Sequence, residues 1–260
     1  MATLKESLSP GPGEMGISPL NGDFLIPSRY PYELSRPSED PRKEPKRGIV
    51  VRVEEVNPSD PNFSRLSRDY LRLLKRPANR SHFTGIYNRV EGSEVVSLSE
   101  EAFEGELRRS GNHTLAAFNV LGEVVGLGVI EDAARGQSDS WLTKVIVVNS
   151  LQNKHIEGGK THVGSQVVDK MAEWAFRTPT SDGRERTVLR AAVVRGVANW
   201  QRMEAVLDNY GFQFGELMKR QAEVLVKING KWELVKRHVQ RLSMSKEEWI
   251  LKHPRGKANN

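Results

Sequence analysis

Two apolar segments with a helical segment between them form the centre of this 260-residue sequence. Residues 140–148 and 186–194 are rich in Val, Ile and Leu over the length of a strand, and Val163, Val167 and Met171 recur between them as one face of a helix. Strands that are joined through a single helix run parallel, because the crossover returns the chain to the same end of the sheet. The pattern therefore predicts a strand–helix–strand unit in which two neighbouring strands of a buried sheet are parallel.

Hairpin patterns flank this unit on both sides. Residues 114–120 and 123–131 have the pattern of two strands around a tight turn, and residues 222–228 and 231–244 flank an Asn-Gly pair. Asn-Gly is favoured in two-residue hairpin turns, because both positions need positive φ angles. Antiparallel pairs on both sides of a parallel unit predict an α/β fold with one mixed sheet covered by helices.

The other periodic segments predict one more strand and further helices. Residues 48–56 alternate as a strand, and the next segment has the pattern of a helix that is capped by Asp60 and has one apolar face. The polar stretch 77–92 is expected to lack regular structure. Further helices are expected over residues 97–109, over residues 203–210 and, with a capping box, after Ser245.

The two ends of the chain differ from the middle in composition. Residues 1–47 hold 8 of the 13 prolines, so they cannot bury enough apolar surface to offset the entropy cost of ordering. We expect residues 1–47 and 254–260 to be disordered and residues 48–253 to form the domain, with docking of residues 24–34 on the domain or on a partner protein as the alternative. With no Cys, no apolar run of membrane-spanning length and no signal-peptide pattern, a cytoplasmic protein without disulfides is expected.

The net charge of +6 is concentrated near the C-terminus. Residues 214–260 carry 11 basic and 5 acidic residues, whereas the two kinds are equal in number over the preceding part of the chain. Basic residues of the last hairpin mix with Trp232 and His238, as they do on surfaces that bind RNA or acidic molecules. A charged edge strand that resists aggregation has the same pattern. The basic residues are Lys227, Lys231, Lys236, Arg237 and Arg241.

A glycine-rich loop leads from the first central strand into the central helix. It contains Gly158, Gly159 and Lys160, and Gly164 follows at the start of the helix. Unpaired N–H groups and the positive end of the helix dipole favour a phosphate group at such a position, although an ordinary turn has the same composition. The loop matches neither the P-loop nor the G-x-G-x-x-G pattern.

With these residues in place, the order of elements resembles the GNAT superfamily of acetyl-CoA-dependent N-acetyltransferases over about residues 48–245. In that family an apolar V-x-V-like strand end leads into a Q/R-x-x-G-x-G/A loop. Here the strand end KVIVVN is followed by Gly159, His162 and Gly164 at the corresponding loop positions. The family also has a later helix that opens with Asn and ends in Gly-Phe, as residues 199–212 do, and the early hairpin looks like its second and third strands.

The resemblance implies a detailed fold and a co-substrate. It implies a mostly antiparallel sheet with helices on both faces, in which the fourth and fifth strands splay apart and acetyl-CoA lies between them. A backbone N–H at a bulge in the fourth strand, at about Val147 or Val148, would polarise the thioester carbonyl. No metal is implied. The residues implied in cofactor binding are Val147, Val148, Lys160, His162, Val163, Gly164, Ser165 and Asn199.

Two residues are expected to move protons if the chain is an enzyme of this kind. Glu131, at the end of a strand, is the first choice of general base, and a solvated carboxylate is the alternative; His155 and Glu157 on the long loop are further candidates. Leu207 occupies the position of the family's thiolate-protonating tyrosine. Tyr210 follows on roughly the same helix face, where it could serve as the acid or be an ordinary core residue.

Three functions are compatible with these residues. The first is transfer of an acetyl group to a primary amine of a small molecule or a protein, with the acceptor bound between residues 77–92 and the last hairpin. The second is a GNAT-like binding or structural protein without catalysis, because His162 and Leu207 stand where the family has other residues. The third is an RNA-associated protein that uses the basic hairpin. In the first case the absence of Cys favours direct transfer over a cysteine acyl-enzyme.

Overall fold

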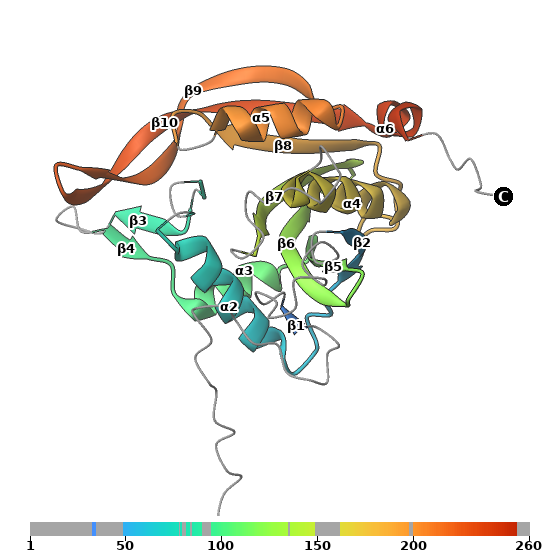
Figure 1. Ribbon diagram of the computed structural model, residues 1–260, viewed down its shortest axis with the longest axis horizontal. Coiled ribbons are helices and arrows are strands. Elements are labelled where there is room, and N and C mark those ends of the chain that lie inside the picture. Colours follow the sequence, from blue (N-terminus) through green and yellow to red (C-terminus); the bar gives the residue numbers. More distant parts are fainter. Residues whose placement is uncertain are drawn as a thin grey trace, which may run out of the picture.

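The structure is a computed structural model, shown in Figure 1. It describes residues 33–34, 49–77, 79, 82–83, 85–89, 95–134, 136–148, 162–197 and 200–253. The segments expected to be disordered, residues 1–47 and 254–260, lie outside these ranges except for residues 33–34.

One large mixed sheet forms the centre of the fold (Figure 1). The strand order is β2-β5-β6-β7-β8-β10-β9, and along this path only β7 and β8 run parallel. This confirms the predicted sheet, which is mostly antiparallel with one parallel pair. The strands are β2 (Val50–Glu55), β5 (Asn112–Asn119), β6 (Glu123–Asp132), β7 (Asp139–Val147), β8 (Val188–Val194), β9 (Gln213–Ile228) and β10 (Lys231–Ser245).

Helices cover both faces of this sheet, as expected. Alternate residues of β5 point to opposite faces: Leu115 and Ala117 belong to one apolar cluster, and Ala116 and Phe118 belong to the other. The first cluster includes residues of α4 (Val163–Arg177), α5 (Trp200–Asn209) and α6 (Lys246–Lys252), and the second includes residues of α2 (Phe63–Lys75) and α3 (Glu100–Leu107).

None of the helices in the described ranges is long and apolar enough to cross a membrane.

The apolar face predicted after residues 48–56 is the buried face of α2. Its members Leu66, Tyr70, Leu73 and Leu74 are all buried. The helix begins later than predicted, because the Asp60 carboxylate accepts a hydrogen bond from the Asn62 backbone N–H and closes a turn before the helix instead of capping it.

The polar stretch 77–92 contains regular structure, contrary to expectation. Within it β3 (Tyr87–Arg89) pairs antiparallel with β4 (Val95–Ser97) in a small separate sheet. Both strands contact β10 of the long C-terminal hairpin, so a partner distant in sequence stabilises a ribbon whose own pattern is too polar to predict it. Figure 1 shows the hairpin reaching over this small sheet.

A short strand from the N-terminal segment joins the large sheet. β1 (Glu33–Leu34) pairs parallel with Glu123 and Val124 of β6. β7 ends opposite Gly126, so this edge of β6 is left for another strand. Residues 33–34, within the segment expected to be disordered, therefore form a strand beside β6, at the end of the stretch 24–34 for which docking on the domain is the alternative.

Candidate active site

The two central parallel strands separate along their length. β7 and β8 pair from Asp139 with Val188 to Leu142 with Ala191. Beyond these pairs, β7 continues to Val147 beside β6, while β8 continues beside β10. The strands form a V that opens toward their carboxyl ends, which is where open α/β sheets bind ligands.

A β-bulge shapes the β7 arm of this V. The β6–β7 register shifts between Leu127 and Val129, so that Lys144 and Val145 both oppose Gly128. Lys144 has a φ of 52°, in the left-handed region that residues other than Gly rarely adopt. Bulges of this kind redirect a strand and its backbone groups, and they occur often next to active sites.

The bulge lies nearer the N-terminus than the sequence predicts. It was expected at about Val147 or Val148, and that location is wrong. The Val148 N–H donates to the Val125 carbonyl at 3.0 Å and is therefore part of the sheet. Because successive N–H groups of a strand point to alternate edges, the Val147 N–H points to the other edge, toward the V. Val147 is thus the better placed of the two to meet a ligand there.

The first turn of α4 lies against the end of β7. A Cβ atom added to Gly164 would lie 3.5 Å from Cγ2 of Val147. His162 is the N-cap residue, and its side chain makes no capping hydrogen bond. Within the described residues no hydrogen-bond acceptor meets the N–H groups of Val163 and Gly164. With the helix dipole behind them, these donors favour an anion beside the mouth of the V.

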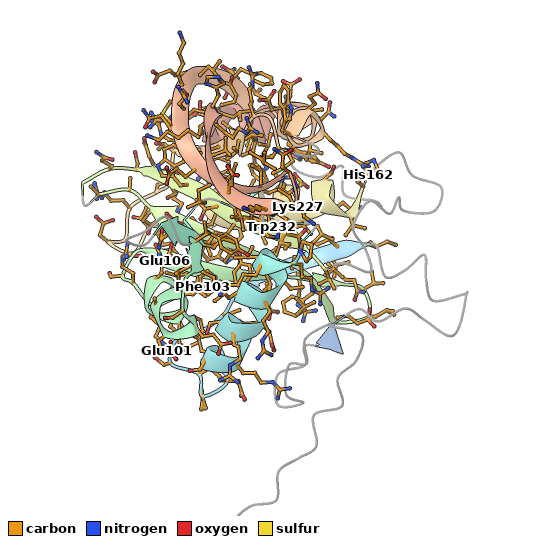
Figure 2. All side chains as sticks on the ribbon, turned by 90° about the vertical axis from the view of Figure 1, so that its left-hand side faces the viewer. Glu101, Phe103, Glu106, His162, Lys227 and Trp232 are labelled. Carbon is orange, nitrogen blue, oxygen red and sulfur yellow. The ribbon has the colours of Figure 1, made fainter. Side chains whose placement is uncertain are left out.

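Arg202 adds a cation to this helix terminus, and sequence reasoning missed it. Its Nη2 atom lies 2.8 Å from Nε2 and 3.0 Å from Nδ1 of His162, so α5 and the start of α4 are linked here. In Figure 2 His162 lies at the edge of the body. Nothing in the sequence pairs residues forty positions apart, so only the folded chain brings this guanidinium to the predicted phosphate site.

Tyr210 lies just beyond α5, beside the first turns of α4. It is partly buried and packs against the cluster that contains α4. Burial raises the pKa of its phenol, the Asp169 carboxylate adds to this, and a hydrogen bond with Ser165 acts in the opposite direction. The phenol therefore keeps its proton at neutral pH. Leu207, in the family's tyrosine position, is buried in the same cluster.

Glu131 lies on the face of the sheet that α2 and α3 cover. Its Oε1 atom accepts hydrogen bonds from Thr143 Oγ1 at 2.6 Å and from Lys144 Nζ at 2.9 Å. Burial alone would raise the pKa of this carboxyl, but the Lys144 ammonium and the two hydrogen bonds hold it below its ordinary value. Glu131 is therefore ionised at neutral pH and engaged in an ion pair.

Several predicted residues lie outside the described ranges. Lys160 and Asn199, implied in cofactor binding, are among them, as are the alternative bases His155 and Glu157. The acceptor site is predicted between residues 77–92 and the last hairpin. In the structure β3, which lies within residues 77–92, contacts β10 of that hairpin.

A second polar cluster lies at the closed end of the V. His113 Nδ1 lies 2.8 Å from a Glu55 carboxylate oxygen, and Nε2 lies 3.0 Å from Asp132 and 3.1 Å from the Ser181 hydroxyl. This arrangement resembles a serine hydrolase triad. Burial alone would lower the pKa of His113, but the hydrogen bonds to both carboxylates outweigh this effect and raise the pKa to about 9. The Ser181 hydroxyl also donates to the Asp132 carboxylate at 3.0 Å, so the cluster links β2, β5, β6 and the segment after α4, and we assign no nucleophile to it.

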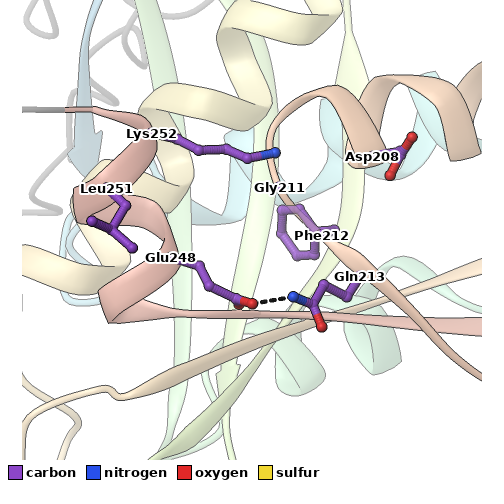
Figure 3. Close-up of a pocket in the computed structure, with 7 residues that line it drawn as sticks. All are labelled: Asp208, Gly211, Phe212, Gln213, Glu248, Leu251 and Lys252. Atoms are coloured by element: carbon purple, nitrogen blue, oxygen red, sulfur yellow. Dashed lines mark hydrogen bonds between the residues drawn. The ribbon is translucent and has the colours of Figure 1, made fainter.

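A shallow pocket of about 250 Å³ lies apart from the V (Figure 3). It is formed by the end of α5, the start of β9 and α6, where Gln213 donates to the Glu248 carboxylate. Its lining includes no residue of β7 or α4, so we do not assign the predicted chemistry to it. Within the described residues no group of His, Cys, Asp and Glu side chains could hold a metal ion.

Solved structures with a similar fold are N-acetyltransferases. A variant of the spermidine N-acetyltransferase SpeG from Vibrio cholerae has a TM-score of 0.50 and 10% identity, covering 78% of this chain and 99% of the other. SpeG in complex with CoA and spermine also gives 0.50 at 10% identity, covering 77% and 98%. The ribosomal L7/L12 alpha-N-protein acetyltransferase RimL, in complex with coenzyme A, gives 0.48 at 13% identity over 74% and 92%. No protein-family model and no curated protein sequence matches the chain.

Proposed function

We propose that this chain, which has the fold of the GNAT superfamily, transfers an acetyl group from acetyl-CoA to a primary amine. The observation that carries the proposal is the V between β7 and β8, with the N–H groups of Val163 and Gly164, which meet no acceptor among the described residues, at its mouth. Coenzyme A contains phosphate groups and an extended pantetheine chain, and the N-terminus of α4 suits the phosphates while the V suits the chain. The acceptor is a small molecule or a protein.

In this proposal the phosphates bind at the start of α4. The donors there are the N–H groups of Val163 and Gly164, with Ser165 and the Arg202 guanidinium beside them; Lys160 and Asn199 are proposed to add to this set. The thioester then lies along the end of β7 near Val147 and Val148. The backbone N–H that points into the V stabilises the oxyanion that develops on the thioester carbonyl.

The chemistry is a direct acyl transfer. The neutral amine attacks the carbonyl carbon, a C–N bond forms, and the C–S bond breaks to release the CoA thiolate. A general base takes a proton from the amine, and Glu131 is the proposed base, directly or through water, because it is ionised at neutral pH. Tyr210 is the proposed acid that returns a proton to the thiolate, because its phenol stays protonated. A cysteine acyl-enzyme has no part, since the chain contains no Cys.

Calorimetric titration with acetyl-CoA tests the proposal first. We expect saturable binding by the full chain, and no binding at millimolar ligand would overturn the proposal. Release of CoA thiol is then followed with a panel of amines, including polyamines, because SpeG has been solved with CoA and spermine. Binding of acetyl-CoA without transfer to any amine or protein acceptor would favour the catalytically silent alternative.

Association with RNA is a second candidate function, favoured by the charges of the C-terminal hairpin. β9 and β10 together carry seven Lys and Arg residues and three Glu residues. Among the described residues, Arg241 is the only one of these cations that reaches a carboxylate, at 4.0 Å from Glu216. Trp232 is 39% exposed and lies opposite Lys227, so an aromatic ring and a cation are neighbours near the tip (Figure 2). Such pairs bind single-stranded RNA through stacking and phosphate contacts. The cations without a carboxylate partner among the described residues are Lys219, Arg220, Lys227, Lys231, Lys236 and Arg237.

Salt-dependent RNA binding tests this second candidate. For a single-stranded RNA oligonucleotide we expect the affinity to fall with salt, and Lys227→Gln/Lys231→Gln to reduce the slope of log K against log salt by roughly 1.4. Arg65→Gln/Arg177→Gln removes two charges from the helices and is the matched control. Equal affinity and slope for both double variants would reject the RNA function and leave the acetyltransferase proposal untouched.

A further inference from the structure

We propose that Tyr70 and Lys144 are positioning residues that hold the β7 bulge in place, so that the backbone after the bulge faces the acyl group. This inference rests on the proposed acetyl transfer. Neither side chain is assigned to contact the substrate; both act through the backbone of β7.

The bulge needs external support because its conformation is unfavourable. Lys144 has a φ of 52° although it carries a side chain, and a left-handed residue of this kind costs roughly 1–2 kcal/mol. The backbone pairing of β6 and β7 does not by itself require this conformation of Lys144. At this point Lys144 and Val145 share a single opposite residue, Gly128, and so lie outside the regular pairing. Contacts beyond the backbone pairing of β6 and β7 must therefore favour it over a regular strand.

The first support comes from α2. The Tyr70 hydroxyl donates a hydrogen bond to the Lys144 carbonyl oxygen at 2.5 Å, across 74 residues of sequence. Tyr70 is fully buried, and its ring packs edge-to-face on Phe103 of α3 with centroids 5.6 Å apart. Burial raises the pKa of this phenol, and the Glu131 and Glu106 carboxylates raise it further, so the hydroxyl remains a donor. A buried ring locked in this way fixes the position of the carbonyl it binds.

The second support comes from α3 and β6 through the Lys144 ammonium. Its Nζ atom lies 2.8 Å from a Glu106 carboxylate oxygen and 2.9 Å from Glu131 Oε1. Figure 2 shows Glu106 on the same helix as Phe103. Burial alone would lower the pKa of Lys144, but the two carboxylates hold it above its ordinary value, so the ammonium keeps its charge. One carboxylate on each of two elements therefore clamps the side chain of the bulge residue.

Together these contacts tie the bulge to α2, α3 and β6. The backbone that continues from Lys144 to Val147 forms one arm of the V. A donor aimed at an oxyanion works only at a close and fixed distance, and displacement by about 1 Å can cost 100-fold in rate. Loosening the bulge should therefore slow the chemical step, while acetyl-CoA still binds through the N-terminus of α4.

Steady-state kinetics of Tyr70→Phe tests the proposal, because this change removes only the hydroxyl. We expect kcat to fall about 10- to 100-fold, with the KM for acetyl-CoA within about twofold of wild type. Ser67→Ala is the matched control: it deletes another buried hydroxyl of α2, which donates to the Ser64 carbonyl and, at 3.4 Å, to the Glu104 carboxylate of α3, and it should leave kcat unchanged. A wild-type kcat for Tyr70→Phe, or an equal loss in Ser67→Ala, would overturn the proposal.

Lys144→Gly is the second variant, and it carries the test if Tyr70→Phe does not fold. Glycine tolerates the left-handed conformation, so this change removes the ammonium clamp without adding backbone strain. We expect a fall in kcat of about 3- to 30-fold with little change in the KM for acetyl-CoA. A rise in KM at constant kcat would show that Lys144 contributes to ligand binding, and would overturn its positioning role.

Amide hydrogen exchange of β7 separates a failure of this inference from a failure of the proposed function. In Tyr70→Phe we expect exchange between Thr143 and Val148 to be at least about tenfold faster than in wild type, and in Ser67→Ala to be unchanged. Unchanged β7 exchange in Tyr70→Phe would overturn the positioning role, whatever the activity. Faster β7 exchange in a protein whose wild type transfers no acetyl group would support the mechanical role and refute the proposed function.

Discussion

At the scale of single residues, the phosphate end of the candidate site combines predicted and unpredicted groups. The sequence placed His162 and Gly164 at the start of a helix, and the structure has them there, with Gly164 next to Val147. Arg202 could not be predicted, because its contact with His162 depends on how α5 packs beside α4. A cation that joins a helix N-terminus increases the attraction for phosphate, so this residue should matter for cofactor affinity.

We expect Arg202→Met to weaken acetyl-CoA binding about tenfold, because one charge-assisted contact is worth roughly 1.4 kcal/mol. Isothermal titration gives the dissociation constant directly. Arg177→Met, at the far end of α4 and 66% exposed, is the matched control and should bind like wild type. Equal affinity of the two variants would show that the Arg202 guanidinium does not face the phosphates.

Tyr210→Phe removes the proposed acid without changing the shape of the side chain. We expect kcat to fall at least about tenfold, with the KM for acetyl-CoA little changed, because a general acid contributes only once the C–S bond breaks. Because the pKa of Tyr210 is raised, the wild-type rate should show no loss from this group below about pH 10. A kcat within twofold of wild type would assign Tyr210 to the core, the alternative that the sequence left open.

At the scale of elements, periodicity located the strands and helices but not the contacts that fix them. The hairpin at Asn229-Gly230 forms as predicted, with φ angles of 50° and 82°. The capping box of Ser245 and Glu248 is also present. A hairpin turn and a helix cap depend on the residues at the turn or cap itself, so the sequence pattern is enough to predict them. The β7 bulge contacts Tyr70 and β3 contacts β10, partners that lie far from them in sequence, so no local pattern predicts the bulge or β3.

The cluster around His113 joins elements in the same non-local way. His113 of β5 lies between Glu55 of β2 and Asp132 of β6, and the Arg186 guanidinium, which is 1% exposed, donates to Asp132 from the segment before β8. The hydrogen bonds to His113 and Ser181 hold the Asp132 carboxyl, despite its burial, well below its ordinary pKa. These charges close the end of the sheet where β7 and β8 still pair.

This cluster should make stability depend on pH. Because the folded-state pKa of His113 is about 9, above its ordinary value, its contribution is complete below about pH 6.5 and is lost as pH rises through 9. The lowered pKa of Asp132 means that its contribution is present above about pH 4 and is lost at lower pH. Urea unfolding of wild type should therefore give a free energy that falls by up to about 3 kcal/mol between pH 6.5 and 9.

The substitution His113→Phe isolates this effect. It keeps a ring beside Trp174 but removes the titrating group, so the fall in unfolding free energy between pH 6.5 and 9 should disappear. His238→Phe on β10 is the matched control and should retain the wild-type profile. The interpretation fails if His113→Phe keeps the same fall with pH.

At the scale of the whole molecule, α4 lies close against the sheet beside the V. β6 presents Gly126 and Gly128 to this helix, and a side chain at either position would collide with side chains of α4. The sequence shows these glycines inside a predicted strand, where they would ordinarily weaken it. The structure explains why these positions are glycines, because Val167 and Met171 of α4 pack directly over them.

Gly126→Ala should therefore disturb both stability and cofactor binding. A Cβ there would lie 2.9 Å from both γ-carbons of Val167 and 3.2 Å from the Ile146 carbonyl oxygen, and neither a β-branched side chain nor a backbone atom can move aside freely. We expect a loss of about 1–3 kcal/mol in unfolding free energy. Because Val167 lies in the same helix as Gly164, pushing α4 outward should also raise the dissociation constant for acetyl-CoA.

Gly105→Ala gives the opposite expectation and so serves as the matched control. Gly105 lies inside α3 with nothing within 4 Å of an added Cβ, so the substitution should stabilise the chain by about 0.5–1 kcal/mol through lower backbone entropy of the unfolded state. Thermal unfolding and acetyl-CoA titration of both variants decide the matter. If Gly126→Ala unfolds and binds like Gly105→Ala, close contact between α4 and β6 does not hold the helix N-terminus at the mouth of the V.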